Sequence, residues 1–209
     1  MQRTRLFLIR HGQVEGFEAK RYNGQRNVPL TGHGRRQLDL VAERLAEVPL
    51  DAVWSSDLDR CRYGAERLAA AHGVTFSCHE RLRELHAGEW EGLTWDELQR
   101  LYPTEWQARL RDIVNYRIPG GESFRDAAER VLPELHRLLA GSPGRNVALV
   151  AHGGVNRIIL LDALGAPLER VFCLEQDYAC INVIDYFADG YRTVRLMNAD
   201  HLPERLCAR

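Results

Sequence analysis

The sequence contains no apolar run near the roughly 20 residues that a membrane-spanning helix needs. It also lacks an excess of charge, because 28 Lys and Arg residues balance 29 Asp and Glu residues and the formal net charge is −1. Such a chain has no bulk attraction for nucleic acid or for an anionic membrane, so we expect neither as a partner. Residues 1–10 offer only the short apolar block LFLI, too little for the core of a signal peptide. We therefore expect a cytoplasmic protein.

Cysteine is scarce, and its spacing indicates neither a disulfide framework nor a zinc site. The five cysteines form no C-x-x-C pair, and an odd number cannot all pair within one chain. They are Cys61, Cys78, Cys173, Cys180 and Cys207. The eight histidines form no H-E-x-x-H pattern, so a dedicated metal site has little support. We expect free thiols and no cofactor.

What the sequence does contain is an alternation of short apolar runs with longer segments of helical periodicity. The runs predict strands at residues 6–9, 53–54, 74–78 and 147–151, and a closing pair at 180–186 and 191–197. This alternation is typical of an α/β fold, and we expect a three-layer α/β/α arrangement with a mainly parallel central sheet. With 209 residues and no long linker, the chain predicts one domain over residues 1–209. The aromatic-rich residues 90–120 predict a small helical excursion, or lid, over one end of the sheet.

Helix boundaries are indicated by two possible capping boxes. Ser56-x-x-Asp59 predicts the start of a helix that ends at Gly73, and Ser123-x-x-Asp126 predicts the start of another. Pro133 lies within the apolar stripe of the second helix, where it removes one backbone donor. We expect a kink there or two shorter helices.

Basic and imidazole side chains follow three of the predicted strands at the points where the strands end. They are Arg10 and His11 after the first strand, Arg60 after the second, and His152 after the strand at 147–151. Ligands of open α/β sheets bind at the carboxyl ends of the strands, so we expect these side chains to converge. Taken singly, each has a plainer explanation: a histidine bonded to backbone, or an arginine in a surface salt bridge, for example with Asp57. Together they indicate a phosphate cradle in which an imidazole could attack phosphorus.

A leaving alkoxide needs a proton, and the candidate donor is Glu84. This residue lies just past the strand predicted at 74–78, within the segment RLREL. Partial desolvation beside a bound phosphate dianion would favour the protonated form of its carboxyl group. The alternative is an exposed glutamate paired with Arg81 or Arg83, and the sequence leaves both open.

These segments resemble the histidine phosphatase superfamily, in its phosphoglycerate-mutase-like branch. The resemblance covers nearly the whole chain and follows the order of the family's motifs. The segments are LIRHG at 8–12, RYNG at 21–24, VPLTGHG at 28–34, SSDLDR at 55–60, LREL at 82–85, GEWEG at 88–92, PGGES at 119–123, VAHGG at 150–154 and NADHL at 198–202.

The resemblance implies a role for each residue of the cradle. His11 would be the phosphorylated nucleophile, and Glu84 the proton donor and later the base for water. Arg10, Arg60 and His152 would hold the phosphoryl group. The family needs no metal, and its members occur as monomers and as oligomers, so a homo-oligomer is possible.

The resemblance also implies contacts with the substrate. They would come from Gln13, which stands where the family often has Glu, and from Asn23, Gly24 and Gly153. An Asn that often follows R-H-G in the family and contacts phosphate is replaced here by Phe17, in an altered loop at 15–20.

Within the family, the sequence favours hydrolysis over phosphoryl transfer between substrate positions. Glu84 is followed by LHAG rather than by the arginine- and tyrosine-bearing stretch of the mutases. The adjacent arginine pair of the mutase excursion is also missing, since Leu110 separates Arg109 from Arg111. The aromatic side chains of 90–120 would receive a partly apolar leaving group, or would form the excursion's own small core.

The sequence therefore predicts a metal-independent phosphomonoesterase that hydrolyses small phosphorylated metabolites through a phosphohistidine. A phosphoglycerate mutase is the alternative within the family. A phospho-ligand binding module would need neither His11 nor Glu84. A serine hydrolase would have to use Ser123 in GESFR, which lacks the final glycine of a nucleophile elbow.

Overall fold

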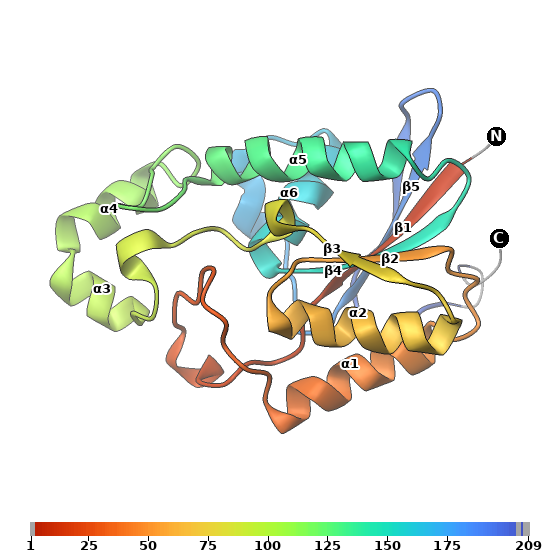
Figure 1. The fold of residues 1–209 in the computed structure, drawn as a ribbon. Helices are drawn as coiled ribbons and strands as arrows, with labels where there is room; N and C mark the ends of the chain where they lie inside the picture. Colours follow the sequence, from red (N-terminus) through yellow and green to blue (C-terminus); the bar gives the residue numbers. More distant parts are fainter. Residues whose placement is uncertain (1–2, 204–205, 207–209) are drawn as a thin grey trace.

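The computed structural model describes residues 3–203 and residue 206. Its centre is one sheet in the order β3-β2-β4-β1-β5-β6 (Figure 1). The strands are β1 (Arg3–Arg10), β2 (Ala52–Ser55), β3 (Phe76–Cys78), β4 (Asn146–Ala151), β5 (Ile181–Phe187) and β6 (Arg192–Ala199). The pairs β1–β4, β2–β4 and β2–β3 are parallel, whereas β1–β5 and β5–β6 are antiparallel. The mainly parallel sheet with a closing antiparallel pair is confirmed.

Helices cover both faces of the sheet and complete the expected three layers. In Figure 1, α1 and α2 lie on one face and α5 and α6 on the other, while α3 and α4 lie beyond one end of the sheet. The helices are α1 (Gly32–Arg44), α2 (Asp59–His72), α3 (Trp95–Leu101), α4 (Pro103–Arg111), α5 (Phe124–Ala140) and α6 (Gly153–Leu164). Short 3₁₀ segments occur at Phe17–Ala19, Glu80–Leu82, Gly88–Trp90 and Leu168–Cys173.

The continuous apolar run of β1 is explained by the layers on either side of it. Successive side chains of a strand point to opposite faces, so both faces of a covered strand must be apolar. Phe7 and Ile9 pack with the core under α1 and α2. Leu6 and Leu8 pack with the core under α5 and α6. All four side chains are fully buried.

One of the two predicted capping boxes is wrong, and so is the alternative of two shorter helices meeting at Pro133. The α2 helix has Leu58 as its N-cap and no side-chain cap, because Ser56 lies two residues too early and is buried at the strand end. The box at Ser123 is confirmed, with Ser123 and Asp126 bonding each other's backbone N–H. The α5 helix runs unbroken through Pro133. Pro133 and Glu129, whose carbonyl loses its helical donor, are both exposed, so water can satisfy that oxygen.

The segment 90–120 contains α3 and α4 together with a buried aromatic cluster. Trp90 is fully buried, and its ring lies 5.9 Å from that of Tyr116 and 6.2 Å from that of Trp106. Trp95 differs, because it is 45% exposed. Trp90 and Trp106 belong to a buried cluster that also includes Phe124 of α5 and Ile158 of α6, so the core of the excursion is continuous with these helices, and Trp95 is not among its buried members.

Two further observations concern the described residues as a whole. None of their helices is both long and apolar enough to cross a membrane. Cys61, Cys78, Cys173 and Cys180 are free thiols, whereas Cys207 lies outside the described residues.

Candidate active site

The three strand ends meet at one edge of the sheet, because β4 runs parallel to both β1 and β2. Arg10, the last residue of β1, pairs in register with Ala151, the last residue of β4. Most of the predicted site residues line a single pocket at this edge. They are Arg10, His11, Asn23, Gly24, Arg60, Glu84 and Gly153. His152 lies directly behind His11, with the two ring centroids 5.3 Å apart. The sequence-based expectation of convergence is confirmed.

The His11 ring is buried, and one of its nitrogens is fixed by the backbone. The residue is only 5% exposed, and its Nδ1 lies 2.8 Å from the carbonyl oxygen of Gly12. A carbonyl oxygen can only accept, so Nδ1 carries the hydrogen and Nε2 keeps its lone pair. Burial, together with the charges of Arg60 and Arg10, holds the pKa of His11 well below its ordinary value. The ring is therefore neutral at physiological pH, with a free nucleophilic nitrogen.

His152 is the N-cap of α6 and has the opposite tautomer. The ring is fully buried, and the Arg60 Nε–H donates to its Nδ1 over 3.3 Å. Since Arg60 can only donate, the hydrogen of the neutral His152 ring is on Nε2. Burial is the main cause of a pKa well below the ordinary value, and Arg60 lowers it further. His152 can therefore serve as a neutral hydrogen-bond donor.

Arg10 and Arg60 carry charges that no carboxylate neutralises within the described part of the chain. Arg60 donates to the carbonyl oxygens of Gly24 and Arg26 over 2.8 and 2.7 Å. Arg10 donates to the carbonyl oxygen of Gln176, and its Nε is buried without a hydrogen-bond partner. The Arg10 guanidinium lies over the ring of Tyr178, 4.0 Å from its centroid. A bound anion would supply the missing acceptor.

The Glu84 carboxylate faces the pocket from the opposite wall. Its Oε2 accepts from the backbone N–H of Gly154 over 3.1 Å, and its Oε1 accepts from Leu85 N–H over 2.9 Å. Arg83, one of the two suggested surface partners, instead binds Asp57. No ion pair joins Glu84 to Arg81 or Arg83 in the described chain. The expected alternative of a surface-paired glutamate is therefore wrong.

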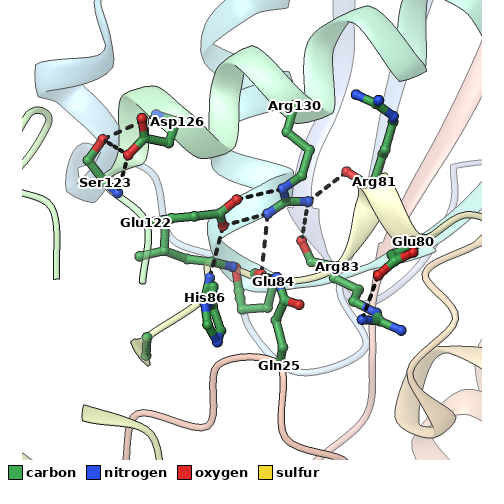
Figure 2. A network of polar contacts seen from close by, with 12 residues as sticks. Gln25, Glu80, Arg81, Arg83, Glu84, His86, Glu122, Ser123, Asp126 and Arg130 are labelled. Atoms are coloured by element: carbon green, nitrogen blue, oxygen red, sulfur yellow. Dashed lines mark hydrogen bonds and ion pairs between the residues drawn. The ribbon is translucent and has the colours of Figure 1, made fainter. Parts of the chain in front are cut away.

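The backbone that carries Glu84 is held by one arginine from α5 (Figure 2). Arg130 makes two parallel hydrogen bonds to Glu122, both 2.8 Å long. It also donates to the carbonyl oxygens of Arg81, Arg83 and Glu84 over 2.7, 3.0 and 3.4 Å. Glu122 in turn accepts from the His86 N–H over 3.0 Å. Four contacts, three from Arg130 and one from Glu122, thus hold the segment on both sides of Glu84 against α5.

Two glycines in this region allow close approach of other groups. A Cβ atom at Gly12 would lie 2.2 Å from the carbonyl oxygen of Gly34, so the absence of a side chain at Gly12 lets this part of the chain pack against the start of α1. A Cβ atom at Gly154 would lie 2.5 Å from Glu84 Oε1. Gly154 therefore lets the carboxylate reach the first turn of α6.

Gln13 is not in the pocket. Its Oε1 accepts from the Thr31 hydroxyl over 3.0 Å, and Thr31 is the N-cap of α1. The side chain thus supports the start of α1 and does not line the pocket to which the predicted substrate contact was assigned. Phe17 also lies outside the pocket lining, in the 3₁₀ turn Phe17–Ala19.

Several pocket residues were not predicted as site residues from the sequence. They are Arg21, Tyr22, Leu85, Trp95, Arg109, Phe124, Gly154, Arg157, Phe172 and Tyr178. Tyr178 sits in a loop before β5, with its ring 5.7 Å from that of His11. Its place depends on the packing of distant segments, and no local pattern marks it. The position of Arg157 on α6, one turn after Gly153, was a usable signal that the sequence analysis missed.

The described residues contain no group of three or more His, Cys, Asp or Glu side chains arranged to hold a metal ion. Ser123, the candidate for a serine nucleophile, is buried and bonds Asp126 as a helix cap. Its hydroxyl is therefore committed to the start of α5.

Comparisons with known proteins agree with this geometry. Residues 6–199 match the model of the histidine phosphatase superfamily, branch 1. The chain is 36% identical over 196 residues to the bifunctional protein Rv2228c of Mycobacterium tuberculosis, covering 93% of this chain and 54% of that protein. The chain thus spans about half the length of the first curated relatives it matches.

Other relatives match over more of their length. Identity is 38% to glucosyl-3-phosphoglycerate phosphatase of Mycolicibacterium vanbaalenii, over 81% of this chain and 78% of that protein. It is 34% to the probable phosphoglycerate mutase GpmB of Serratia proteamaculans, over 78% and 75%. The solved structure of a mycobacterial glucosyl-3-phosphoglycerate phosphatase superposes with a TM-score of 0.85 at 30% identity, covering 94% of this chain and 99% of that one. The chain belongs to the histidine phosphatase superfamily.

Proposed function

We propose that this chain is a phosphoric monoester hydrolase that acts on small phosphorylated metabolites through a phosphohistidine at His11. The observation that carries the proposal is the neutral His11 ring with its free Nε2, set between Arg10, Arg60 and His152. The phosphatase relatives support hydrolysis as the reaction class. The reaction needs no metal, because two guanidinium groups and the N–H of His152 supply the positive charge and hydrogen bonds that the phosphoryl oxygens require.

The first step transfers the phosphoryl group to the enzyme. His11 Nε2 attacks phosphorus in line, the new N–P bond forms, and the bond to the leaving oxygen breaks. Arg10, Arg60 and the Nε2–H of His152 bind the phosphoryl oxygens as charge shifts onto them. Positive charge that develops on the His11 ring is stabilised by the Gly12 carbonyl oxygen, which accepts from Nδ1. The backbone thus holds the ring in the attacking orientation throughout.

Glu84 moves the protons of both steps. In its protonated form it gives a proton to the leaving oxygen, and as a carboxylate it then takes a proton from the water that attacks phosphohistidine. Inorganic phosphate leaves, and His11 returns to its neutral form. The two backbone N–H donors to Glu84 hold its carboxyl group in place at the pocket.

We favour hydrolysis over a mutase reaction because the segment after Glu84 lacks the mutase pattern. Leu85 and His86 occupy this stretch, and Arg109 has no adjacent arginine. A mutase must also keep water away from the phosphohistidine, whereas Trp95 and Phe172 at this pocket are 45% and 60% exposed.

The proposal is tested by incubating the wild type and His11→Ala with chelator and a substrate panel. The panel contains p-nitrophenyl phosphate, 3-phosphoglycerate and several sugar phosphates, and both free phosphate and isomerised product are measured. We expect phosphate release by the wild type and none by His11→Ala. Isomerised phosphoglycerate with little free phosphate would make the chain a mutase. Phosphate release that persists in His11→Ala would overturn the assignment of the nucleophile.

A further inference from the structure

The Arg10 guanidinium lies among other positive groups at the edge of the sheet. A Cβ atom at Gly153, the first residue of α6, would lie 3.3 Å from Arg10 Nε and 3.2 Å from Arg157 Nη1. The N-terminal end of a helix carries a partial positive charge, so α6 and Arg157 both repel the guanidinium. Because no carboxylate neutralises Arg10 within the described chain, other groups must hold it there.

Tyr178 supplies one of these groups, the face of its ring. The central guanidinium carbon of Arg10 lies 4.0 Å from the Tyr178 ring centroid. This distance is well within the range at which an aromatic face attracts a cation. The same ring lies 5.7 Å from the ring of His11 and lines the pocket. Tyr178 therefore packs beside both the proposed nucleophile and the cation that precedes it in the chain.

Gln176 supplies the second group, a backbone carbonyl oxygen that accepts from Arg10 Nη1. The residue is only 2% exposed, and its side-chain amide makes two reciprocal hydrogen bonds with Asn182 of β5, both 2.9 Å long. Asn156 of α6 donates to the same amide oxygen over 3.2 Å. Since Asn156 and Asn182 are fully buried on regular elements, the Gln176 carbonyl oxygen has a fixed position relative to the sheet.

The backbone after Tyr178 is bound to the end of β1. The Ala179 N–H donates to the His11 carbonyl oxygen over 3.1 Å, and the Arg10 N–H donates to the Cys180 carbonyl oxygen over 3.2 Å. Ala179 has a φ of 59°, in the left-handed region that residues with a side chain rarely adopt. Such a conformation persists only where surrounding contacts impose it. Here those contacts are the ones that place Tyr178 beside Arg10.

We propose that Tyr178 is a positioning residue for Arg10. The face of its ring and the Gln176 carbonyl oxygen together hold the guanidinium in one orientation, against the repulsion of α6 and Arg157. In that orientation the remaining donors of Arg10 are available to the phosphoryl group. The inference rests on the proposed function, because it presupposes that Arg10 binds phosphoryl oxygens. The ring acts through Arg10 and takes no part in making or breaking bonds.

The test measures the binding of orthovanadate by calorimetry, since this anion can occupy the phosphoryl position and has no leaving group to contact the ring. In Tyr178→Leu we expect a Kd about 3- to 30-fold higher than in the wild type, the range for a cation–π contact shielded from water. Tyr178→Phe keeps the ring face and should bind within about twofold of the wild type. Tyr191→Leu, at a tyrosine that is 68% exposed, is the matched control and should bind like the wild type.

A double variant separates the positioning of Arg10 from simple packing. In an Arg10→Gln background, Tyr178→Leu should raise the Kd no further, because the cation that the ring holds is gone. A second comparison keeps the shape of the ring. A trifluorinated phenylalanine at position 178 has a less negative face, so its Kd should exceed that of Tyr178→Phe. Thermal unfolding of each variant establishes that it is folded.

Two results would overturn the inference: an unchanged vanadate Kd in Tyr178→Leu, or the same increase with and without Arg10. The proposed function fails separately, if the wild type hydrolyses no phosphomonoester, including p-nitrophenyl phosphate. In that event the vanadate affinities still decide whether Tyr178 positions Arg10. A wild type that does not bind vanadate would refute both the phosphoryl site and the role of Tyr178.

Discussion

The two active-site histidines have different proposed roles, and the groups around them select a different tautomer for each ring. Burial, and after it the charge of Arg60, lowers the pKa of each ring and keeps both rings neutral. Their backbone and side-chain partners then select opposite tautomers. The Gly12 carbonyl oxygen accepts from Nδ1 of His11, so the lone pair of that ring is on Nε2. The Arg60 Nε–H donates to Nδ1 of His152, so the hydrogen of that ring is on Nε2. One ring can therefore attack phosphorus while the other donates to its oxygens.

Glu84→Gln tests the proton donor. The amide cannot give up a proton as a carboxylic acid does, so the substitution should slow substrates with poor leaving groups most, by about 10²- to 10⁴-fold. Substrates with good leaving groups, such as p-nitrophenyl phosphate, need little help in the first step. Rates of phosphoryl transfer to the enzyme across alkyl and aryl phosphates measure this dependence. Equal slowing for leaving groups of widely different pKa would count against Glu84 as the acid.

At the level of single residues, the sequence predicted the residues proposed to react and to bind phosphate, but not all of the residues that line the pocket. Arg10, His11, Arg60 and His152 could be found because they lie at strand ends or in the first turn of a helix, and Glu84 because it lies in the segment after β3. Gln13 lies outside the pocket lining, and its local sequence cannot show that its side chain turns to the N-cap of α1. Arg109 and Tyr178 reach the pocket from segments whose positions depend on long-range packing, which no short motif reports.

Among the elements, the segment around Glu84 depends on a single residue of α5. Arg130 binds Glu122 and three successive parts of that segment, as Figure 2 shows. Because bidentate Arg–carboxylate pairs combine strength with fixed geometry, this contact sets the direction in which Glu84 points. The carboxylate also needs the first turn of α6, where Gly154 supplies its second donor.

Arg130→Met should therefore impair proton transfer without removing a group that touches substrate. We expect kcat to fall most for poor leaving groups, as in Glu84→Gln, while KM changes little. Arg137→Gln is the matched control, because Arg137 pairs with Glu134 on the exposed part of the same helix. If Arg130→Met slows all substrates by the same factor, the residue supports the fold alone. A pH–rate profile provides an independent readout, since a misplaced Glu84 alters the limb that reports the acid.

Element positions were predictable where the pattern was long and periodic. The run that became β1 and the stripe that became α5 are examples, because each must bury its apolar side against a neighbouring layer. The start of α2 was misplaced because Ser56 matches a capping box in sequence but lies at the buried strand end. At Pro133 we expected a kink or two shorter helices; α5 is not divided, because the exposed position of Pro133 makes the lost hydrogen bond tolerable.

At the scale of the whole molecule, the buried histidines make the stability of the fold depend on pH. Histidine in an unfolded chain has a pKa of about 6.5, whereas His11 and His152 have lower values when folded. As the pH falls from about 6.5 to 5, the unfolded chain takes up protons that the folded chain does not. The free energy of unfolding therefore falls with pH in this window, by up to about 1.4 kcal/mol per pH unit for each histidine.

This dependence is measured by urea unfolding between pH 5 and 8 in phosphate-free buffer. Above about pH 7 the two histidine rings are neutral in both the folded and the unfolded chain. Their contribution to the pH dependence of the free energy of unfolding should therefore vanish there. Replacing both with His11→Gln and His152→Gln should flatten the decline below pH 6.5, whereas His33→Gln, at an exposed position, should not. The same decline in the double variant as in the wild type would show that other groups cause it.

The central claim is that His11 carries the phosphoryl group during turnover, and rapid quenching tests it most directly. The enzyme is mixed with p-nitrophenyl phosphate, stopped in alkali within milliseconds, and digested for mass spectrometry. We predict a phosphate on the peptide of His11 that survives alkali and is lost in acid, absent in His11→Ala and more abundant in Glu84→Gln. Release of p-nitrophenol with no phosphoprotein in any of the three proteins, or phosphate on another residue, would contradict the account.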